Sequence, residues 1–413
     1  MKVLIVSTHD QQGGAAIAAF RLLEALNKNG IRATMLVLDK RSNNPNVIQV
    51  GNPMLNKLRF ATERATIFMK NGFSKKNLFD ISIANTGVSI VNHPEFKEAD
   101  IVHLHWISQG MLSIKEIGKI LTSGKKIVWT MHDMWPFTGI CHHAGSCDHF
   151  ETNCGQCPYL KTPSEKDISY STFLRKQTAY SLGKIHFVAC SNWLKELALK
   201  SSLTSSHEVS SIPNPLNTTT YRTKDKTSLR KLMNLPIDKK IILFAAAKVS
   251  DKRKGIDYLV KASKIMSEEK NDFVFLIVGS NSEGIMKQLA LPAHNASYVP
   301  SEQMPEMYNV ADVFVTPSLQ ENLPNTIMES MACGTPCVGF NVGGIPEMID
   351  HKQNGYVANY KDAEDLSKGL LWVLEEADAK ELSENARKKI IENYSEEIVA
   401  NKYLEIYQNS TTL

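Results

Sequence analysis

Short apolar runs alternate along the chain with longer segments in which apolar residues recur at helical spacing. The runs are continuously apolar, which is typical of strands buried on both faces, and they cover residues 3–6, 34–38, 101–104, 127–131, 187–190, 241–245, 273–278, 313–315 and 337–340. The segments between them that have a helical period include 15–29, 113–123, 255–269 and 362–375. This order predicts an α/β fold of parallel sheets covered by helices.

The elements form two series, separated by Ile212-Pro213-Asn214-Pro215. Two prolines in so short a stretch stop either kind of element. We therefore expect two doubly wound, Rossmann-like domains, 1–213 and 214–394, followed by a final helical segment, 395–413.

Polar residues follow several of the expected strands. His132-Asp133 comes after the run 127–131, Lys248 after 241–245, and the polar stretch that ends at Glu321 after 313–315. Ligands of doubly wound sheets bind beyond the carboxyl ends of the strands. We therefore expect the functional site in a central cleft that the two domains face.

Composition narrows the class of protein. With 413 residues, 47 Lys+Arg and 43 Asp+Glu, the chain carries a formal charge of only +4, which gives no sign of a nucleic-acid-binding surface. Its apolar runs are too short to span a membrane, and no cleavable leader is recognisable at Met1-Lys2. We expect a cytoplasmic protein, whose seven cysteines are reduced or bind metal.

The segment 316–347 places two carboxylates eight positions apart, Glu321 and Glu329, around a helix start at Pro324. Cys333-Gly334 would end that helix. The free amides of a helix N-terminus favour a bound anion such as a diphosphate. A carboxylate beside them can accept hydrogen bonds from the two hydroxyls of a ribose. A solvated surface glutamate is the simpler explanation for either residue taken alone.

The same segment, TPSLQENLPNTIMESMACGTPCVGFNVGGIPE, resembles the donor-site region of the family 4 retaining glycosyltransferases, of the bacterial surface-polysaccharide type. The resemblance implies the GT-B fold, with two Rossmann-like halves. It implies that Glu329 binds the ribose of a nucleotide sugar and that Glu321 faces the donor sugar. The neighbouring loop would line the sugar and diphosphate through Asn322, Leu323, Asn325 and Thr326.

The resemblance extends to other positions. Lys248 and Lys254 would lie on the donor diphosphate, next to Arg253, although arginine is more usual than lysine at the first of these positions. Gly14 corresponds to the family's N-terminal glycine pair, and His132 to a histidine beside the reacting sugar. The family needs no metal for catalysis, since basic side chains neutralise the leaving diphosphate. The segment 395–413 would cross back onto the N-terminal domain.

The function implied is retaining transfer from a nucleoside-diphosphate sugar, with UDP or GDP as the nucleotide, to a hydroxyl of a glycan or lipid-linked glycan in surface polysaccharide synthesis. Two alternatives remain open from the sequence. One is a noncatalytic protein that binds nucleotide sugars or glycans, and the other is a nucleotide-sugar epimerase of similar fold.

Four cysteines lie close together in the loop 141–157: Cys141, Cys147, Cys154 and Cys157. The spacing Cys154-x-x-Cys157 is that of a zinc knuckle, and two further thiolates would complete a tetrahedral structural site. Two disulfides, or free thiols, are the alternative. A catalytic metal is disfavoured, because four cysteine ligands leave no open position.

The segment 53–79 carries six Lys or Arg against one acid, so it alone is more basic than the whole chain. Leu55, Leu58, Phe60 and Phe68 give it an incomplete apolar face. Such a helix is able to lie on an anionic membrane surface, at the inner face of the membrane beside a lipid-linked acceptor. An ordinary solvated basic helix is the competing interpretation.

Overall fold

The computed structural model describes residues 1–269 and 272–409. The chain forms two compact units. The first contains residues 1–215 and the chain from residue 399 onward, and the second contains residues 216–398. The division lies two residues after the expected boundary at 213, and the final helix is shared, with its residues from Val399 belonging to the first unit.

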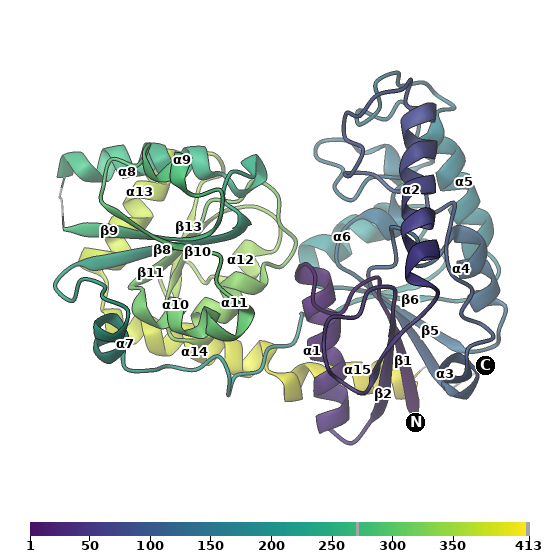
Figure 1. The fold of residues 1–413 in the computed structure, drawn as a ribbon, viewed down its shortest axis with the longest axis horizontal. Helices are drawn as coiled ribbons and strands as arrows, with labels where there is room; N and C mark the ends of the chain where they lie inside the picture. Colours follow the sequence, from purple (N-terminus) through teal and green to yellow (C-terminus); the bar gives the residue numbers. More distant parts are fainter. Residues whose placement is uncertain (270–271, 410–413) are drawn as a thin grey trace. The chain divides into compact units, whose positions relative to one another are not determined.

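The first unit is built on a seven-stranded, wholly parallel sheet in the order β3-β2-β1-β4-β5-β6-β7 (Figure 1). Its strands are β1 (Lys2–Val6), β2 (Arg32–Val37), β3 (Val47–Gln49), β4 (Ile101–Leu104), β5 (Lys126–Met131), β6 (His186–Ala189) and β7 (Glu208–Ser211). Its helices are α1 (Gly14–Lys28), α2 (Pro53–Lys70), α3 (Pro94–Glu98), α4 (Ile114–Leu121), α5 (Ile168–Tyr180), α6 (Asn192–Lys200) and α15 (Glu396–Asn409).

Helices cover both faces of this sheet. On one face the side chains of α1 and α15 pack against alternate residues of the central strands, such as Val3 and Ile5. On the other face, Leu4 and Val6 belong to a larger core with residues of α2, α4, α5 and α6. Burial on both faces explains why these strands are continuously apolar.

The second unit repeats the plan with a six-stranded parallel sheet in the order β10-β9-β8-β11-β12-β13. Its strands are β8 (Lys240–Lys248), β9 (Phe273–Ser280), β10 (Ala293–Ser297), β11 (Val313–Thr316), β12 (Cys337–Phe340) and β13 (Gly355–Ala358). Its helices are α7 (Lys226–Leu232), α8 (Ile256–Glu269), α9 (Glu283–Met286), α10 (Met304–Val310), α11 (Asn325–Ala332), α12 (Ile345–Met348), α13 (Ala363–Leu371) and α14 (Ala379–Tyr394). Figure 1 shows α8 and α13 on one face and α10, α11 and α14 on the other.

The predicted fold class, two doubly wound parallel sheets, is therefore confirmed. The sequence analysis missed β3, β7, β10 and β13, which are the edge strands of the two sheets. Edge strands pair on one side only and need no continuous apolar run. Among the residues that the structure describes, no helix combines the length and apolar character needed to cross a membrane.

Candidate active site

The loop between β11 and α11 carries most of the residues expected to bind a donor, and the turn before α8 fixes one side of it. Gly255 has φ +69°, and a Cβ there would lie 1.7 Å from the carbonyl oxygen of Pro317. The amide of Leu319 donates to the carbonyl of Arg253 at 2.7 Å. Only glycine permits so close an approach of two backbones.

The other side of the loop is fixed by the turn that follows β12. Gly343 has φ +59°, and a Cβ there would lie 1.7 Å from the carbonyl oxygen of Glu321. The amide of Gly344 donates to the carbonyl of Asn322 at 2.8 Å. The backbone around Glu321 is therefore held from two directions by main-chain contacts.

These contacts bring Glu321 next to Lys254. The Lys254 ammonium donates to Glu321 Oε1, and the Ser318 hydroxyl donates to the same oxygen at 3.1 Å. The Glu321 side chain is more deeply buried than that of Lys254, with exposed fractions of 14% and 36%. An ammonium and a carboxylate thus lie together at the carboxyl edge of the second sheet, the edge where ligands of such folds bind.

Helix α11 begins at Asn325 and ends at Ala332, as the motif predicts, with Gly334 at φ +80° just beyond. Asn322 and Leu323 are buried in the preceding loop, while Asn325 and Thr326 start the helix. The first amides of a helix have no partner within it, so this end is suited to an anion.

Glu329 lies one turn inside α11 and is buried. The hydroxyl of Tyr308, in α10, donates to Glu329 Oε2 at 2.8 Å. Burial, followed by the charge of Glu329, raises the pKa of Tyr308 well above its usual value, so the phenol stays protonated and keeps the carboxylate in place. The sequence analysis missed Tyr308, because an aromatic residue in a helix reads as a core residue.

The remaining basic residues lie nearer the surface. Lys248 is exposed at the end of β8. Arg253 is also exposed, and its guanidinium pairs with the Asp251 carboxylate at 2.8 Å. Lys254 is therefore the basic residue of this group that the structure joins directly to an expected site residue.

In the first unit, Gly13 and Gly14 form the turn between β1 and α1. Gly13 has φ +89°, which an L side chain rarely adopts, and Gly14 is the first residue of the helix. The turn thus presents the N-terminus of α1 at the carboxyl edge of the first sheet.

His132 follows β5 at the same edge. Its Nε2 lies 2.9 Å from Nδ1 of His105, and its Nδ1 lies 3.5 Å from Sγ of Cys190. Burial lowers the pKa of His132 to about 4, despite the opposing charge of Asp133, and burial lowers that of His105 well below its usual value. Both imidazoles are therefore neutral at pH 7.

Asp133 points into a separate network. Its carboxylate accepts hydrogen bonds from Nε1 of Trp106 at 2.9 Å and from the amide of Trp135 at 2.8 Å, and Nδ1 of His142 lies 2.7 Å away. Burial alone would raise its pKa, but His142, the charge of His143 and the amide of Trp135 lower the pKa to about 2. Asp133 is thus a charged residue that fixes the loop after His132.

His103 is a core residue rather than part of the edge. It is fully buried, with Nδ1 2.6 Å from the hydroxyl of Tyr407 and Nε2 2.7 Å from that of Thr130. Burial lowers its pKa to about 3. This histidine therefore joins α15 to the first sheet.

Comparison with known proteins agrees with these observations. Residues 225–389 match the family described as Glycosyl transferases group 1. An uncharacterised glycosyltransferase of Methanocaldococcus jannaschii is 28% identical over 76% of this chain and 84% of its own length. The Escherichia coli UDP-Gal:alpha-D-GlcNAc-diphosphoundecaprenol alpha-1,3-galactosyltransferase is 23% identical over 52% of this chain and 57% of its own length.

Among solved structures, Anabaena HepE in complex with UDP-glucose superposes with a TM-score of 0.64 at 14% identity, covering 99% of this chain and all of the other. Two doubly wound parallel sheets of this kind define the GT-B class of glycosyltransferases. The match to the group 1 glycosyltransferase family lies within the second unit, and the chain is an enzyme of the transferase kind. Of the functions considered from the sequence, we therefore retain the transferase.

Proposed function

We propose that this enzyme is a retaining glycosyltransferase that moves a sugar from a nucleoside-diphosphate sugar to a hydroxyl of a glycan or lipid-linked glycan in surface polysaccharide synthesis. The observation that carries the proposal is the Lys254–Glu321 pair, held at the carboxyl edge of the second sheet by the close approaches at Gly255 and Gly343. It supplies a positive group for a diphosphate and a carboxylate for a sugar.

In this mechanism the second unit binds the donor. Glu329 accepts hydrogen bonds from the ribose hydroxyls, while Lys254, with Lys248 and Arg253 near it in sequence, faces the diphosphate. As the glycosidic bond breaks, negative charge grows on the leaving phosphate, and a fixed ammonium stabilises it more than it stabilises the bound donor. Glu321 orients the sugar. The acceptor hydroxyl attacks from the face that the diphosphate leaves and gives its proton to the leaving phosphate.

His132 has a different part in this proposal. Because its imidazole is neutral at pH 7, it is able to exchange the long contact of Nδ1 with Cys190 for a hydrogen bond to a sugar hydroxyl, without repelling a cationic centre that develops at the anomeric carbon. We propose that it positions the reacting sugar.

For the nucleotide we favour UDP, since two of the similar proteins are named for or bound to UDP-sugars. Calorimetry with UDP-glucose, UDP-galactose, UDP-N-acetylglucosamine and GDP-mannose tests this choice. We expect micromolar to millimolar binding of at least one UDP-sugar and weaker binding of GDP-mannose. Tighter binding of GDP-mannose would reverse the nucleotide assignment.

Incubation of the donor alone separates the transferase from an epimerase. We expect the donor to remain unchanged apart from slow hydrolysis, and an acceptor to be needed for rapid release of the nucleoside diphosphate. Conversion of the donor to an epimer without any acceptor would contradict the proposal.

We also propose that α2 brings the enzyme to a membrane carrying a lipid-linked acceptor. The buried residues of this helix include Glu63 and Arg64, whereas Met54 and Leu58 are 79% and 60% exposed. Phe73, just after the helix, is also exposed, and several lysines lie near these apolar residues in the sequence. An outward apolar face rimmed by lysine suits the surface of an anionic bilayer.

Vesicle flotation tests this surface. We expect the protein to float with phosphatidylglycerol vesicles and not with phosphatidylcholine vesicles. Leu58→Glu should abolish flotation, while Ile391→Glu, at an exposed apolar position of the second unit, should leave it unchanged. Equal flotation of both variants would rule out α2 as the contact.

A further inference from the structure

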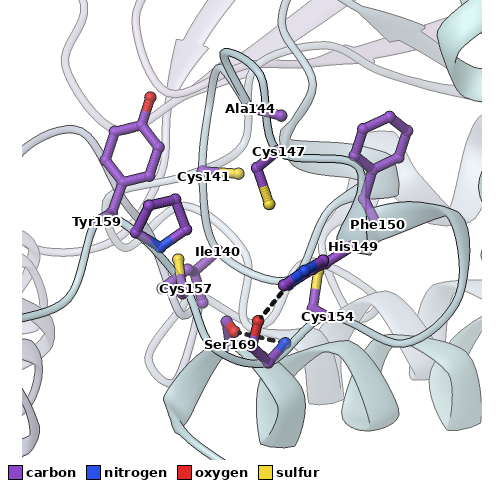
Figure 2. A pocket seen from close by; sticks show the side chains of 12 residues that line it. Ile140, Cys141, Ala144, Cys147, His149, Phe150, Cys154, Cys157, Tyr159 and Ser169 are labelled. Atoms are coloured by element: carbon purple, nitrogen blue, oxygen red, sulfur yellow. Dashed lines mark hydrogen bonds between the residues drawn. The ribbon is translucent and has the colours of Figure 1, made fainter. Parts of the chain in front are cut away.

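The four cysteines of the loop 141–157 converge on one small cavity of the first unit. Figure 2 shows their sulfur atoms around a common space, beside the imidazole of His149. Cys141 and Cys157 are buried, and Cys147 and Cys154 are half-buried. Each of these thiols is near enough to the other three for their charges to interact. The loop therefore gathers four soft ligand atoms that the sequence places up to sixteen residues apart.

The backbone between Cys154 and Cys157 has an unusual conformation. Cys154, Gly155 and Gln156 have φ values of 54°, 113° and 46°, and two of these residues are not glycine. Successive left-handed residues turn the chain sharply, and non-glycine residues there cost on the order of 1 kcal/mol each. Such a turn brings the two thiols of a Cys-x-x-Cys pair to the same side of the loop.

Backbone amides point at two of the sulfurs. The amide of Gly139 donates to Sγ of Cys154 at 3.2 Å, and the backbone of Tyr159 donates to the thiol of Cys157. Such donors favour the thiolate form, which is the form that binds a metal. Nδ1 of His149 lies 2.8 Å from the carbonyl oxygen of Gly155, so this nitrogen donates to the loop backbone.

A buried positive charge lies beside the cluster. Lys176, in α5, is completely buried, donates to the carbonyl of Thr138 at 2.9 Å and lies 3.5 Å from the ring centre of Trp135. Burial lowers its pKa to about 7, while the nearby thiols of Cys154 and Cys141 act in the opposite direction. A negatively charged partner would stabilise the buried ammonium of this lysine.

We propose that the loop binds one structural zinc ion through four thiolates, those of Cys141, Cys147, Cys154 and Cys157. Binding exchanges four thiol protons for one Zn²⁺, so the site gains a net charge of −2, which the ammonium of Lys176 partly neutralises. Four cysteine ligands leave no position for substrate, so the ion holds the fold and takes no part in transfer.

The side chains need a small rearrangement to bind the ion. Among residues 1–269 and 272–409, no three His, Cys, Asp or Glu side chains already have the arrangement of a metal site, and the seven cysteines are free thiols. In this state burial raises the pKa of Cys154 to about 11 and that of Cys157 to about 12. The sulfurs face one cavity, so the proposal requires these side chains to turn further inward.

The site would affect the active site through Cys141. Its neighbour His142 contacts both Asp133 and the hydroxyl of Ser82, and Asp133 follows His132 directly. A metal at Cys141 therefore fixes the loop that begins at His132. The inference stands apart from the proposed function, since it predicts metal content whatever the reaction.

The test uses the full-length protein, purified under reducing conditions without added metal. We expect about one zinc per chain by mass spectrometry of the metal, retained through dialysis. Cys154→Ser and Cys147→Ser should each lower the zinc content to less than about a fifth of an equivalent per chain. Cys337→Ser is the matched control, because this buried thiol lies in the second unit, where it contacts carbonyl oxygens.

Two further measurements cover the case in which a variant fails to fold. A thiol-specific reagent added to the wild type should release zinc in step with the cluster's thiols, and cobalt substitution should give the absorption bands of a tetrahedral cobalt thiolate. Less than half an equivalent of zinc would overturn the proposal. In a thiol titration of protein denatured without reductant, four missing thiols would then indicate two disulfides, and seven titrating thiols would indicate a metal-free cluster.

Discussion

The carboxyl edges of the two sheets differ in charge. In the second unit the edge carries an ammonium and a carboxylate in contact, Lys254 and Glu321, on a loop fixed by main-chain approaches. In the first unit the corresponding edge carries neutral imidazoles, His105 and His132, held by hydrogen bonds between side chains. The same architecture therefore supports two chemistries: fixed charge suits an anionic donor, and neutral polar groups suit sugar hydroxyls.

The largest effect is expected at the charged edge. Lys254→Ala should lower kcat about 10²- to 10³-fold, the usual cost of removing one donor that stabilises growing negative charge. The half-exposed ion pair contributes little to folding, so the melting temperature should barely change. Steady-state kinetics with and without EDTA is the measurement. We expect turnover to survive EDTA.

Lys252→Ala is the matched control, because Lys252 is exposed two positions away on the same turn. It should leave kcat within about threefold of the wild type. If both variants lost activity equally, the turn as a whole, rather than the Lys254 ammonium, would be responsible.

The next effect concerns donor affinity. Glu329→Ala should weaken binding of the nucleotide sugar by about 1.5 to 3 kcal/mol, because charge-assisted hydrogen bonds to the ribose are lost. Tyr308→Phe removes only the phenol that holds the carboxylate and should cost about 0.5 to 1.5 kcal/mol. Calorimetry measures both, and unchanged affinity in Glu329→Ala would remove this residue from the donor site.

A third variant tests whether main-chain contact holds the charged edge. Gly255→Ala adds a Cβ that would meet the carbonyl of Pro317, and it requires φ +69° of an alanine. We expect a loss of about 1 to 3 kcal/mol of stability and a lower kcat, since Glu321 would shift. Gly284→Ala, where the new Cβ meets no atom within 4 Å, should change neither. Equal melting temperatures for the two variants would show that the approach is dispensable.

The smallest effect concerns the neutral edge and depends on pH. The folded-state pKa of His132, about 4, lies below the unfolded value near 6.5. The unfolded chain therefore binds more protons in this range, so the stability is complete above about pH 6.5 and is lost as pH falls toward 4. His132 should contribute on the order of 1 to 2 kcal/mol of this loss between pH 7 and pH 5.

Tryptophan fluorescence during denaturation measures this loss of stability. The signal comes mainly from the first unit, since only Trp372 of the five tryptophans lies outside it. His132→Gln should flatten the dependence on pH. His351→Gln, at an exposed position of the second unit, should leave it unaltered. An identical slope in all three proteins would mean that His132 titrates normally.

Interior and edge strands differ in how far the sequence predicts them. The interior strands were predictable because burial on both faces requires continuous apolar runs, as in Phe273–Ser280. The edge strands were not: β10 reads Ala-His-Asn-Ala-Ser and is mostly exposed, and β3 has three residues. Their strand character comes from pairing with a single neighbour, which no local pattern records.

The residues of the candidate site were likewise predictable only where they lie close together in the sequence. Glu321, Glu329 and Lys254 were found because they lie in short contiguous motifs around one loop. The partners that hold them in place were not, since Tyr308 lies twenty-one residues from Glu329 and belongs to another helix. The sequence also did not predict that Arg253 pairs with Asp251 rather than with Glu321, because this pairing depends on the conformation of the turn that carries both residues.

The path of the chain has a consequence for how the protein is made. The first unit encloses the second in sequence, because Tyr403 and Tyr407 of α15 pack on the sheet that begins at Lys2. During translation, the part of that face that α15 covers, beside α1, stays exposed while some 180 further residues emerge. The half of the enzyme that is synthesised first is therefore completed last, once α15 has emerged from the ribosome.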